Sequence, residues 1–172
     1  MTAPFVADCY LPNETAQLEL GRALAPALIG RAGLIFLHGD LGAGKTTLVR
    51  GLLRGLGVTG TVRSPTYTLI EPYSIQLADK TTTWPLFHLD LYRLADPREL
   101  DELGWRDLRA DGGLLLIEWP ERGAPLLPAA DVSLHLTITA SARQLRASGQ
   151  PSWAAVMAVM QCFSDPQKVQ VN

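Results

Sequence analysis

The chain has 172 residues, of which 47% are hydrophobic and 19% are charged. This composition excludes a disordered chain, and the length suits one globular domain over residues 1–172 with a full hydrophobic core. The formal net charge of −2 argues against a large phosphate-binding surface, so tight direct binding to nucleic acid is not expected.

No targeting segment or membrane segment is readable in the sequence. Residues 1–4 lack a basic region followed by an apolar core, and the longest apolar run is far shorter than the ~20 residues that a membrane span requires. The two cysteines, Cys9 and Cys162, lie near opposite ends of the sequence without His or Cys at metal-binding spacing. Two isolated thiols fit a reducing compartment better than a disulfide framework, so we expect a cytoplasmic protein that does not associate with a membrane.

The sequence up to the first glycine-rich loop predicts a strand, a helix and a second strand. Residues 4–11 are predicted to form a strand at the edge of a sheet. Asn13 is the predicted N-cap of a helix that runs to about Ile29, and Pro26 should kink or shorten this helix. A short apolar strand is predicted at 34–37.

A phosphate-binding motif follows this strand. Residues 39–46 match G-x-x-x-x-G-K-[ST] without a gap, and residues 47–56 predict a helix with leucines along one stripe. Strand, glycine-rich loop and helix in this order direct backbone N–H groups toward phosphate oxygens, and this context disfavours a chance match in a glycine-rich turn. Lys45 should reach the β- and γ-phosphates, and the Thr46 hydroxyl should bind Mg²⁺. We therefore predict a nucleoside triphosphate site with contacts from Leu41, Gly42, Ala43, Gly44, Lys45, Thr46 and Thr47.

Five further strands and two helices are predicted downstream of the motif. The strands cover 69–75, 86–92, 114–118, 132–138 and a short segment at 143–146, and the helices cover 98–103 and 152–163. The stretch 76–85 is predicted to be a solvated hairpin loop. The helix predicted at 98–103 is acidic, and Gly104 should end it. Residues 114–118 are apolar on both faces, as a central parallel strand requires. One α/β domain accounts for these elements, with a C-terminal helix and tail over 148–172.

Two carboxylates are candidates for the metal and for catalysis. Glu118 ends the central apolar strand, where phosphate-binding folds place an acidic residue for Mg²⁺ or its water shell. Asp90 shares one strand face with His88 and Tyr92, and this polar set indicates a lined cavity in which Asp90 orients the attacking water or shares the metal. The alternatives are a solvated strand-end carboxylate for Glu118 and a satisfied buried polar network for Asp90.

A candidate switch loop lies at Ser64–Thr68, after the nucleotide-binding helix. Nucleotide switches keep a loop at this position that contacts the γ-phosphate, and Thr66 is the hydroxyl that we expect to make this contact. An ordinary proline-containing turn is the alternative. Trp119, directly after Glu118, should pack the loop or remain exposed, while His38 and His135 are interpreted as structural.

Four blocks of sequence together carry a family resemblance. These blocks are 39–47, 64–68, 88–93 and 117–121, in this order. Over about residues 5–146 the chain resembles the TsaE (YjeE) family of bacterial ATPases, which takes part in making threonylcarbamoyladenosine at position 37 of tRNA. The resemblance implies an α/β, P-loop NTPase-like three-layer fold with a mixed central sheet. From Gly149 onward no motif matches.

The resemblance also implies cofactors and partners. Family members are small cytoplasmic proteins that bind ATP or ADP with Mg²⁺, and they bind the TsaB–TsaD pair. They use ATP binding and hydrolysis to support turnover and do not themselves transfer the threonylcarbamoyl group. Contact with tRNA is then only indirect, which agrees with the acidic charge balance.

Roles for individual residues follow from their positions in the matching blocks. The resemblance assigns Mg²⁺ to Thr46 and Glu118, the phosphates to Lys45, and hydrolysis and the switch to Asp90 and Thr66. It places Trp119 near the switch. Further nucleotide contacts fall on two residues outside the four blocks, Glu14 at the start of the first helix and Arg143 in the last strand.

Two other functions stay open from the sequence. A small-molecule kinase begins with the same loop and has a similar length, although no Arg-rich lid segment is visible here. A non-hydrolysing, ATP-dependent assembly module would use nucleotide binding only to order a surface for a partner. Phosphate release in the presence and absence of partners separates the three functions.

Overall fold

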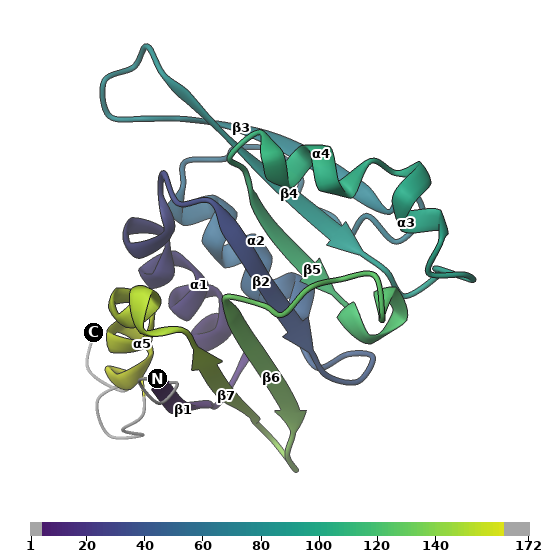
Figure 1. Cartoon of the computed structure of the whole chain (residues 1–172). Helices are drawn as coiled ribbons and strands as arrows, with labels where there is room; N and C mark the ends of the chain where they lie inside the picture. The colour runs from purple at the N-terminus through teal and green to yellow at the C-terminus, as the bar shows by residue number, and fades with distance from the viewer. Residues whose placement is uncertain (1–4, 164–172) are drawn as a thin grey trace.

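A mixed sheet of seven strands forms the centre of the computed structural model, which describes residues 5–163. The strands are β1 (Phe5–Leu11), β2 (Gly33–His38), β3 (Ile70–Gln76), β4 (Thr83–Asp90), β5 (Leu114–Glu118), β6 (Val132–Ile138) and β7 (Arg143–Gly149). Their order across the sheet is β1-β7-β6-β2-β5-β4-β3 (Figure 1). Strands β6, β2, β5 and β4 run parallel, whereas the β1–β7, β7–β6 and β3–β4 pairs are antiparallel. The predicted edge position of the first strand is confirmed.

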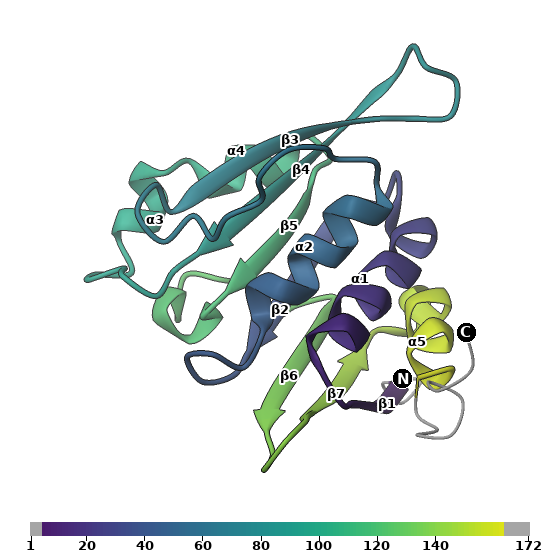
Figure 2. The same ribbon diagram turned by 180° about the vertical axis from the view of Figure 1, so that it is seen from behind.

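Helices cover both faces of this sheet. They are α1 (Glu14–Leu28), α2 (Lys45–Gly55), α3 (Glu99–Glu102), α4 (Trp105–Ala110) and α5 (Ala154–Gln161), with 3₁₀ turns η1 (Pro120–Gly123) and η2 (Pro151–Trp153). Helices α1, α2 and α5 lie on one face and are seen in front of the sheet in Figure 2, while α3 and α4 cover the other face. The predicted three-layer, P-loop NTPase-like α/β fold with a mixed sheet is confirmed.

The alternation of side chains along β5 divides the core into two clusters. Leu114 and Leu116 pack with the apolar faces of α1, α2 and α5, whereas Leu115 and Ile117 pack on the opposite side with Trp105 of α4. All five residues of β5 are buried. This is the burial expected of a central parallel strand that is covered on both faces. Glu118, the polar residue at the end of β5, is therefore held by a rigid element.

Three glycines allow α1 and α2 to pack closely. A Cβ added to Gly21 would lie 2.4 Å from the carbonyl oxygen of Leu48, one added to Gly51 would lie 2.3 Å from that of Leu18, and one added to Gly55 would lie 2.8 Å from that of Arg22. Distances this short would force the helix backbones apart, so side chains are excluded at these positions. The close crossing holds α2, the helix that follows the glycine-rich loop, firmly against α1.

The first helix has the predicted cap. The side chain of Asn13 accepts a hydrogen bond from the backbone N–H of Ala16 at 2.9 Å. This satisfies one of the free N–H groups at the helix N-terminus. Pro26 lies in the last turn, and the helix ends at Leu28, close to the predicted end.

The predicted hairpin loop over 76–85 was too long, and the predicted strand at 86–92 is shifted. Strand β4 already begins at Thr83 and ends at Asp90, and Trp84 is buried opposite Ile75 of β3. Pro85 is tolerated because β5 pairs with β4 only from Leu86 onward, so at this point β4 has a strand on one side alone.

The helix predicted at 98–103 is shorter than expected and is followed by a helix that was not predicted. Helix α3 ends at Glu102, and Gly104 adopts φ 66°, a left-handed conformation that reverses the chain into α4. Glycine was interpreted only as a stop signal. Here it also precedes a second helix, because Trp105 directly after it is buried in the core.

The C-terminal elements also differ in extent from the prediction. Strand β7 continues to Gly149 instead of residue 146, because it pairs along its whole length with β1 and β6. Helix α5 is confined to 154–161 within the predicted 152–163. The rest of the predicted tail, from residue 164, and the first residue of the predicted strand at 4–11 lie outside the described residues.

Two sequence expectations about the whole chain can be compared with the described part. Cys9 and Cys162 are both free thiols, in agreement with their interpretation as isolated. Over residues 5–163, no helix is long and apolar enough to cross a membrane.

Candidate nucleotide-binding site

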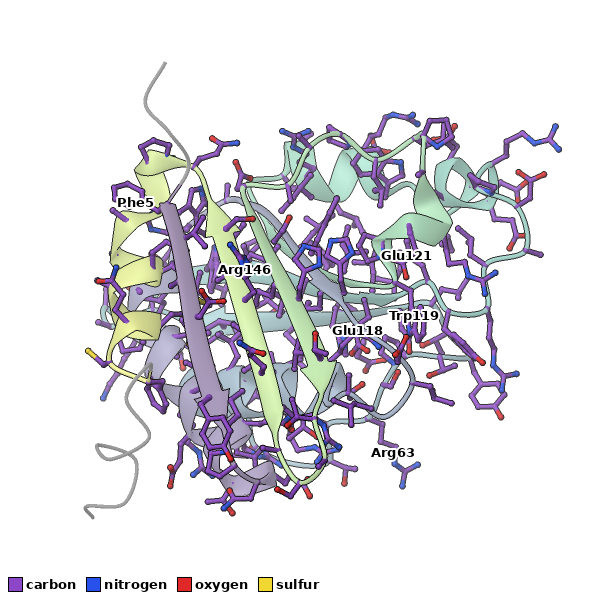
Figure 3. The ribbon with its side chains drawn as sticks, turned by 90° about the horizontal axis from the view of Figure 1, so that it is seen from below. Phe5, Arg63, Glu118, Trp119, Glu121 and Arg146 are labelled. Carbon is purple, nitrogen blue, oxygen red and sulfur yellow. The ribbon has the colours of Figure 1, made fainter. Side chains whose placement is uncertain are left out.

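The candidate site lies at the carboxyl ends of three parallel strands. Strand β2 leads into the glycine-rich loop, β5 ends at Glu118 and β4 ends at Asp90. Asp90 and Glu118 are direct register partners, and Leu37 near the end of β2 is the partner of Glu118 on the other side. Figure 3 shows Glu118, Trp119 and Glu121 close together at this end of the sheet. Open α/β sheets bind ligands at this edge.

The glycine-rich loop is held from behind by the first helix. Gly44 has φ 101°, and a Cβ at this position would lie 2.4 Å from Oε1 of Gln17. Gln17 is buried, and its Nε2 donates a hydrogen bond to the carbonyl oxygen of Ala43 at 3.1 Å. Gln17 was not predicted as a site residue. The available signal was a polar residue beside the apolar stripe of the first helix.

Lys45 is enclosed in the site. Only 4% of its surface is exposed, and its Nζ donates to the carbonyl oxygens of Gly39 at 2.5 Å and Asp40 at 3.0 Å. The ammonium also lies 4.0 Å from the ring centre of Trp119, a cation–π contact. Burial lowers the pKa of Lys45, while the nearby Glu118 and other carboxylates act in the opposite direction. The arrangement presents a cation, partly removed from water, for which an anion would be a stronger partner.

Thr46 and Glu118 form one polar pair. The Thr46 hydroxyl donates to the Glu118 carboxylate, at 2.8 Å from Oε1 and 3.1 Å from Oε2. No group of three or more His, Cys, Asp or Glu residues within 5–163 forms a metal cage. A hydroxyl and a single carboxylate nevertheless fit Mg²⁺, which usually takes one or two protein ligands and completes its shell with water and phosphate.

Asp90 belongs to a second polar group that is formed by the candidate switch loop. Its Oδ2 accepts hydrogen bonds from the hydroxyls of Ser64 and of Thr66, the latter at 2.8 Å, and its Oδ1 accepts from the backbone N–H of Tyr92 at 3.0 Å. Asp90 is buried. The alternative of a satisfied polar network therefore describes its contacts in this structure, and the network ties the loop at 64–68 to the end of β4.

Two pockets adjoin the glycine-rich loop. One, of about 270 Å³, contains both polar groups, and the other, of about 350 Å³, lies on the side of α1 and β7. Gly42, Gly44 and Thr47 line both, so the two pockets meet across the loop. The predicted residues in the first are Leu41, Gly42, Gly44, Lys45, Thr46, Thr47, Thr66, Asp90, Glu118 and Trp119, and the second adds Glu14 and Arg143.

Among the predicted contact residues, Ala43 lines neither pocket, because its side chain is buried. Its carbonyl oxygen is used by Gln17. Arg143 reaches the loop from β7, where its Nη2 donates to the carbonyl oxygen of Gly42 at 3.2 Å. Glu14 is largely exposed at the pocket edge, 3.5 Å from Arg50. The structure thus brings twelve of the predicted residues to one continuous concave surface, counting ten in the first pocket and two more in the second.

The three histidines of the chain have different surroundings. The rings of His38 and His135 stack with centroids 4.2 Å apart, and Nδ1 of His38 lies 3.4 Å from Glu121. Burial and then the charge of His135 lower the pKa of His38. Neither ring lines the two pockets. His88 is fully buried, and its Nε2 lies 2.8 Å from Oε1 of Glu118.

Comparison with known proteins identifies the family to which this site belongs. Residues 11–146 match the family model described as threonylcarbamoyl adenosine biosynthesis protein TsaE. The chain is a member of the TsaE family. The tRNA threonylcarbamoyladenosine biosynthesis protein TsaE of Haemophilus influenzae is 44% identical over 145 residues, which cover 82% of this chain and 88% of that protein. The protein of the same name from a Nostoc species is 40% identical over 141 residues, or 80% and 82% of the two chains.

A solved structure agrees at the level of the fold. The crystal structure of Bacillus subtilis YdiB superimposes with a TM-score of 0.70 and covers 96% of this chain and 100% of its own, at 21% sequence identity. The family match over residues 11–146, together with the relatives, confirms the resemblance to the TsaE family that was inferred from four short blocks. The assignment of individual site residues to nucleotide, metal and hydrolysis stays a prediction.

Proposed function

We propose that this TsaE-family chain is the Mg²⁺-dependent ATPase subunit that supports threonylcarbamoyladenosine modification at position 37 of tRNA, together with TsaB and TsaD. Family membership supports the role in tRNA modification. The main support for ATP binding and hydrolysis is the pocket of about 270 Å³, which is lined by Lys45, the Thr46–Glu118 pair and the Thr66–Asp90 pair.

The glycine-rich loop and Lys45 would bind the phosphates. Helix α2 begins at Lys45, so its free N–H groups lie at the loop, where they favour an anion. The Lys45 ammonium now uses two carbonyl oxygens and the Trp119 ring. Phosphate oxygens are stronger, charged acceptors, so nucleotide binding would draw the ammonium toward them.

Thr46 and Glu118 would hold the metal. When bound, Mg²⁺ would neutralise phosphate charge and so stabilise the transition state of phosphoryl transfer. The Thr46 hydroxyl already donates its proton to Glu118, which leaves its lone pairs available to a cation. Glu118 supplies the negative charge that balances the metal.

Asp90 would orient the attacking water, and Thr66 would sense the γ-phosphate. The Asp90 carboxylate already accepts hydrogen bonds from Ser64, Thr66 and Tyr92, so its capacity for a water is largely used. A change in the loop at 64–68 would free it. Such a requirement supports slow hydrolysis by the chain alone and faster hydrolysis with a partner that stabilises the changed loop.

Two large exposed side chains, one on each loop of the site, support a protein partner. Leu41 of the glycine-rich loop is 71% exposed, and Tyr67 of the candidate switch loop is 83% exposed. The guanidinium of Arg93 lies 4.2 Å from the ring centre of Tyr67. Large exposed side chains beside a site are common at protein interfaces, where Tyr and Arg are enriched. The net charge of −2 supports only indirect contact with tRNA. A cytoplasmic location is proposed because it fits the role in tRNA modification.

The test is phosphate release from ATP by the purified chain, with and without TsaB–TsaD. We expect slow, Mg²⁺-dependent release by the chain alone and a several-fold increase with the pair. ATP binding without phosphate release, even with TsaB–TsaD, would instead support an assembly module. ATP consumption that appears as a phosphorylated metabolite would support a kinase.

A further inference from the structure

His88 is a fully buried polar side chain in the sheet. It is 0% exposed in β4, and its neighbours on the same sheet face are Leu86 and Asp90 in its own strand, Leu116 opposite it in β5 and Glu71 opposite it in β3. A leucine would satisfy this position without any hydrogen-bonding requirement. Burying an imidazole is costly unless its polar atoms are bonded, so its presence calls for a specific partner.

That partner is Glu118. The pairs His88–Leu116 and Asp90–Glu118 are consecutive pairs on one sheet face, so Glu118 lies diagonally from His88. Nε2 of His88 is 2.8 Å from Oε1 of Glu118, while its Nδ1 has no hydrogen-bond partner among the residues that the structure describes. A proton on Nδ1 would be a buried donor without an acceptor, so the network assigns the proton to Nε2, which donates to the carboxylate.

Two donors from different elements hold the Glu118 carboxylate. His88 binds Oε1 from the sheet, and Thr46 donates to Oε1 at 2.8 Å from helix α2, with a longer contact to Oε2 at 3.1 Å. Oε1 therefore accepts two short hydrogen bonds and Oε2 only the longer one. The His88 bond restricts rotation of the carboxylate, so that Glu118 stays in place as the acceptor for the Thr46 hydroxyl.

We propose that His88 is a positioning residue for the metal. It holds Glu118 in the orientation in which the Thr46 hydroxyl donates its proton to the carboxylate, so that the lone pairs of the Thr46 oxygen stay available to Mg²⁺. The proposal rests on the proposed function, because it concerns the same Mg²⁺–nucleotide site. Partners that orient metal-binding carboxylates typically change metal affinity by about 10–100-fold when removed. His88 lines neither pocket, so its effect on the site would pass through Glu118, its hydrogen-bond partner.

The test uses His88→Gln, His88→Asn and His88→Leu in the full chain. The amide nitrogen of Gln reaches the position of Nε2, whereas that of Asn reaches only the position of Nδ1, and Leu has no donor. The affinity for ATP is measured by equilibrium titration at increasing Mg²⁺ and again with a chelator. Melting temperatures of the nucleotide-free variants identify those that fold.

We expect His88→Asn and His88→Leu to raise about tenfold the Mg²⁺ concentration at which half of the Mg²⁺-dependent gain in ATP affinity is reached. The ATP affinity measured with a chelator should be unchanged in both variants. His88→Gln should keep the Mg²⁺ requirement of the original chain. If Leu does not fold, the Gln–Asn pair decides. An unchanged Mg²⁺ requirement in Asn, or the same loss in Gln as in Asn, would overturn the role of His88. Absence of Mg²⁺-dependent ATP binding by the unaltered chain would instead overturn the proposed function.

Discussion

The two buried carboxylates of the site sit side by side in the sheet but are connected to different kinds of structure. Glu118 is bonded to Thr46 on α2 and His88 on β4, both within regular elements. Asp90, its register partner, is bonded mainly to the hydroxyls of the loop at 64–68. The two carboxylates are thus equally buried, but the partners of Glu118 lie in regular elements, whereas two of the three partners of Asp90 lie in a loop. Loops generally move more readily than the elements that they connect.

This difference suggests a division of work. A metal ligand benefits from a rigid setting, because metal affinity depends on ligands that are already in position. A residue that acts only in one nucleotide state benefits from a partner loop that can change. We therefore expect substitutions around Glu118 to change Mg²⁺-dependent binding and substitutions around Asp90 to change turnover and partner response.

The largest effect should come from Lys45, whose ammonium is influenced by both carboxylates. Lys45→Ala removes the cation that both carboxylates influence, and with it the charged hydrogen bonds to phosphate. We expect ATP affinity to fall by about a hundredfold or more, as the loss of about 3 kcal/mol would produce. Isothermal titration calorimetry measures the affinity, and the melting temperature should change little. Unaltered affinity would contradict the site itself and make the comparison of the carboxylates meaningless.

A slightly smaller effect is expected on turnover at the Asp90 side. Asp90→Asn keeps the size of the side chain but weakens its ability to orient and deprotonate a water. We expect ATP affinity within about threefold of the original and phosphate release with TsaB–TsaD reduced by about a hundredfold, the range of general acid–base effects. Parallel loss of binding and turnover would show that Asp90 acts in binding, as a metal ligand would.

The matching change on the other side is Glu118→Ala. It removes the acceptor of the Thr46 hydroxyl, so Mg²⁺ should no longer strengthen ATP binding. We expect affinity in Mg²⁺ to fall by about tenfold while affinity measured with a chelator is kept. Binding in both conditions with lost turnover would mean that the roles of Glu118 and Asp90 are exchanged.

The smallest effect should appear in the response to a partner. Thr66→Ala removes one hydroxyl from the Asp90 network and the proposed contact to the γ-phosphate. The preference of TsaB–TsaD for the ATP-like over the ADP state should shrink several-fold, with ADP affinity nearly unchanged because ADP has no γ-phosphate. Tyr67→Ser, which alters the exposed side chain beside it, is a useful comparison, since it should weaken the partner in both nucleotide states. If TsaB–TsaD still preferred the ATP-like state of the Thr66→Ala variant to the same extent, Thr66 would have no role in sensing the nucleotide.

The parts of this site that can be predicted from the sequence are those whose residues lie close together in the sequence. The loop at 39–46 and the helix after it could be predicted because their signal is contiguous. The partners of Asp90 and Glu118 could not, because they depend on the parallel register of β4 and β5 and on contacts across 24–72 residues of sequence. Gln17 was missed for the same reason, since its partner Ala43 lies on the loop and not on its own helix.

The errors in the fold have local causes as well. Threonines and a proline at 81–85 have the composition of a loop, but pairing with β3 extends β4 through them. Gly104 has the usual sequence context of a helix end, and the burial of Trp105 then starts α4, which helix periodicity over six residues could not reveal. Tertiary pairing and packing override local propensity in both places.

The central claim is that the loop tied to Asp90 reports the nucleotide state to a partner, and the affinity of TsaB–TsaD for the unaltered chain tests it most directly. The affinity is measured with Mg²⁺ and a non-hydrolysable ATP analogue and, separately, with Mg²⁺ and ADP. Because coupling between two binding sites is reciprocal, a partner that prefers the ATP-like loop must also tighten binding of the analogue. We predict tighter binding of the pair in the ATP-like state and an equal factor in the reverse titration. Equal partner affinity in the two nucleotide states would contradict the account.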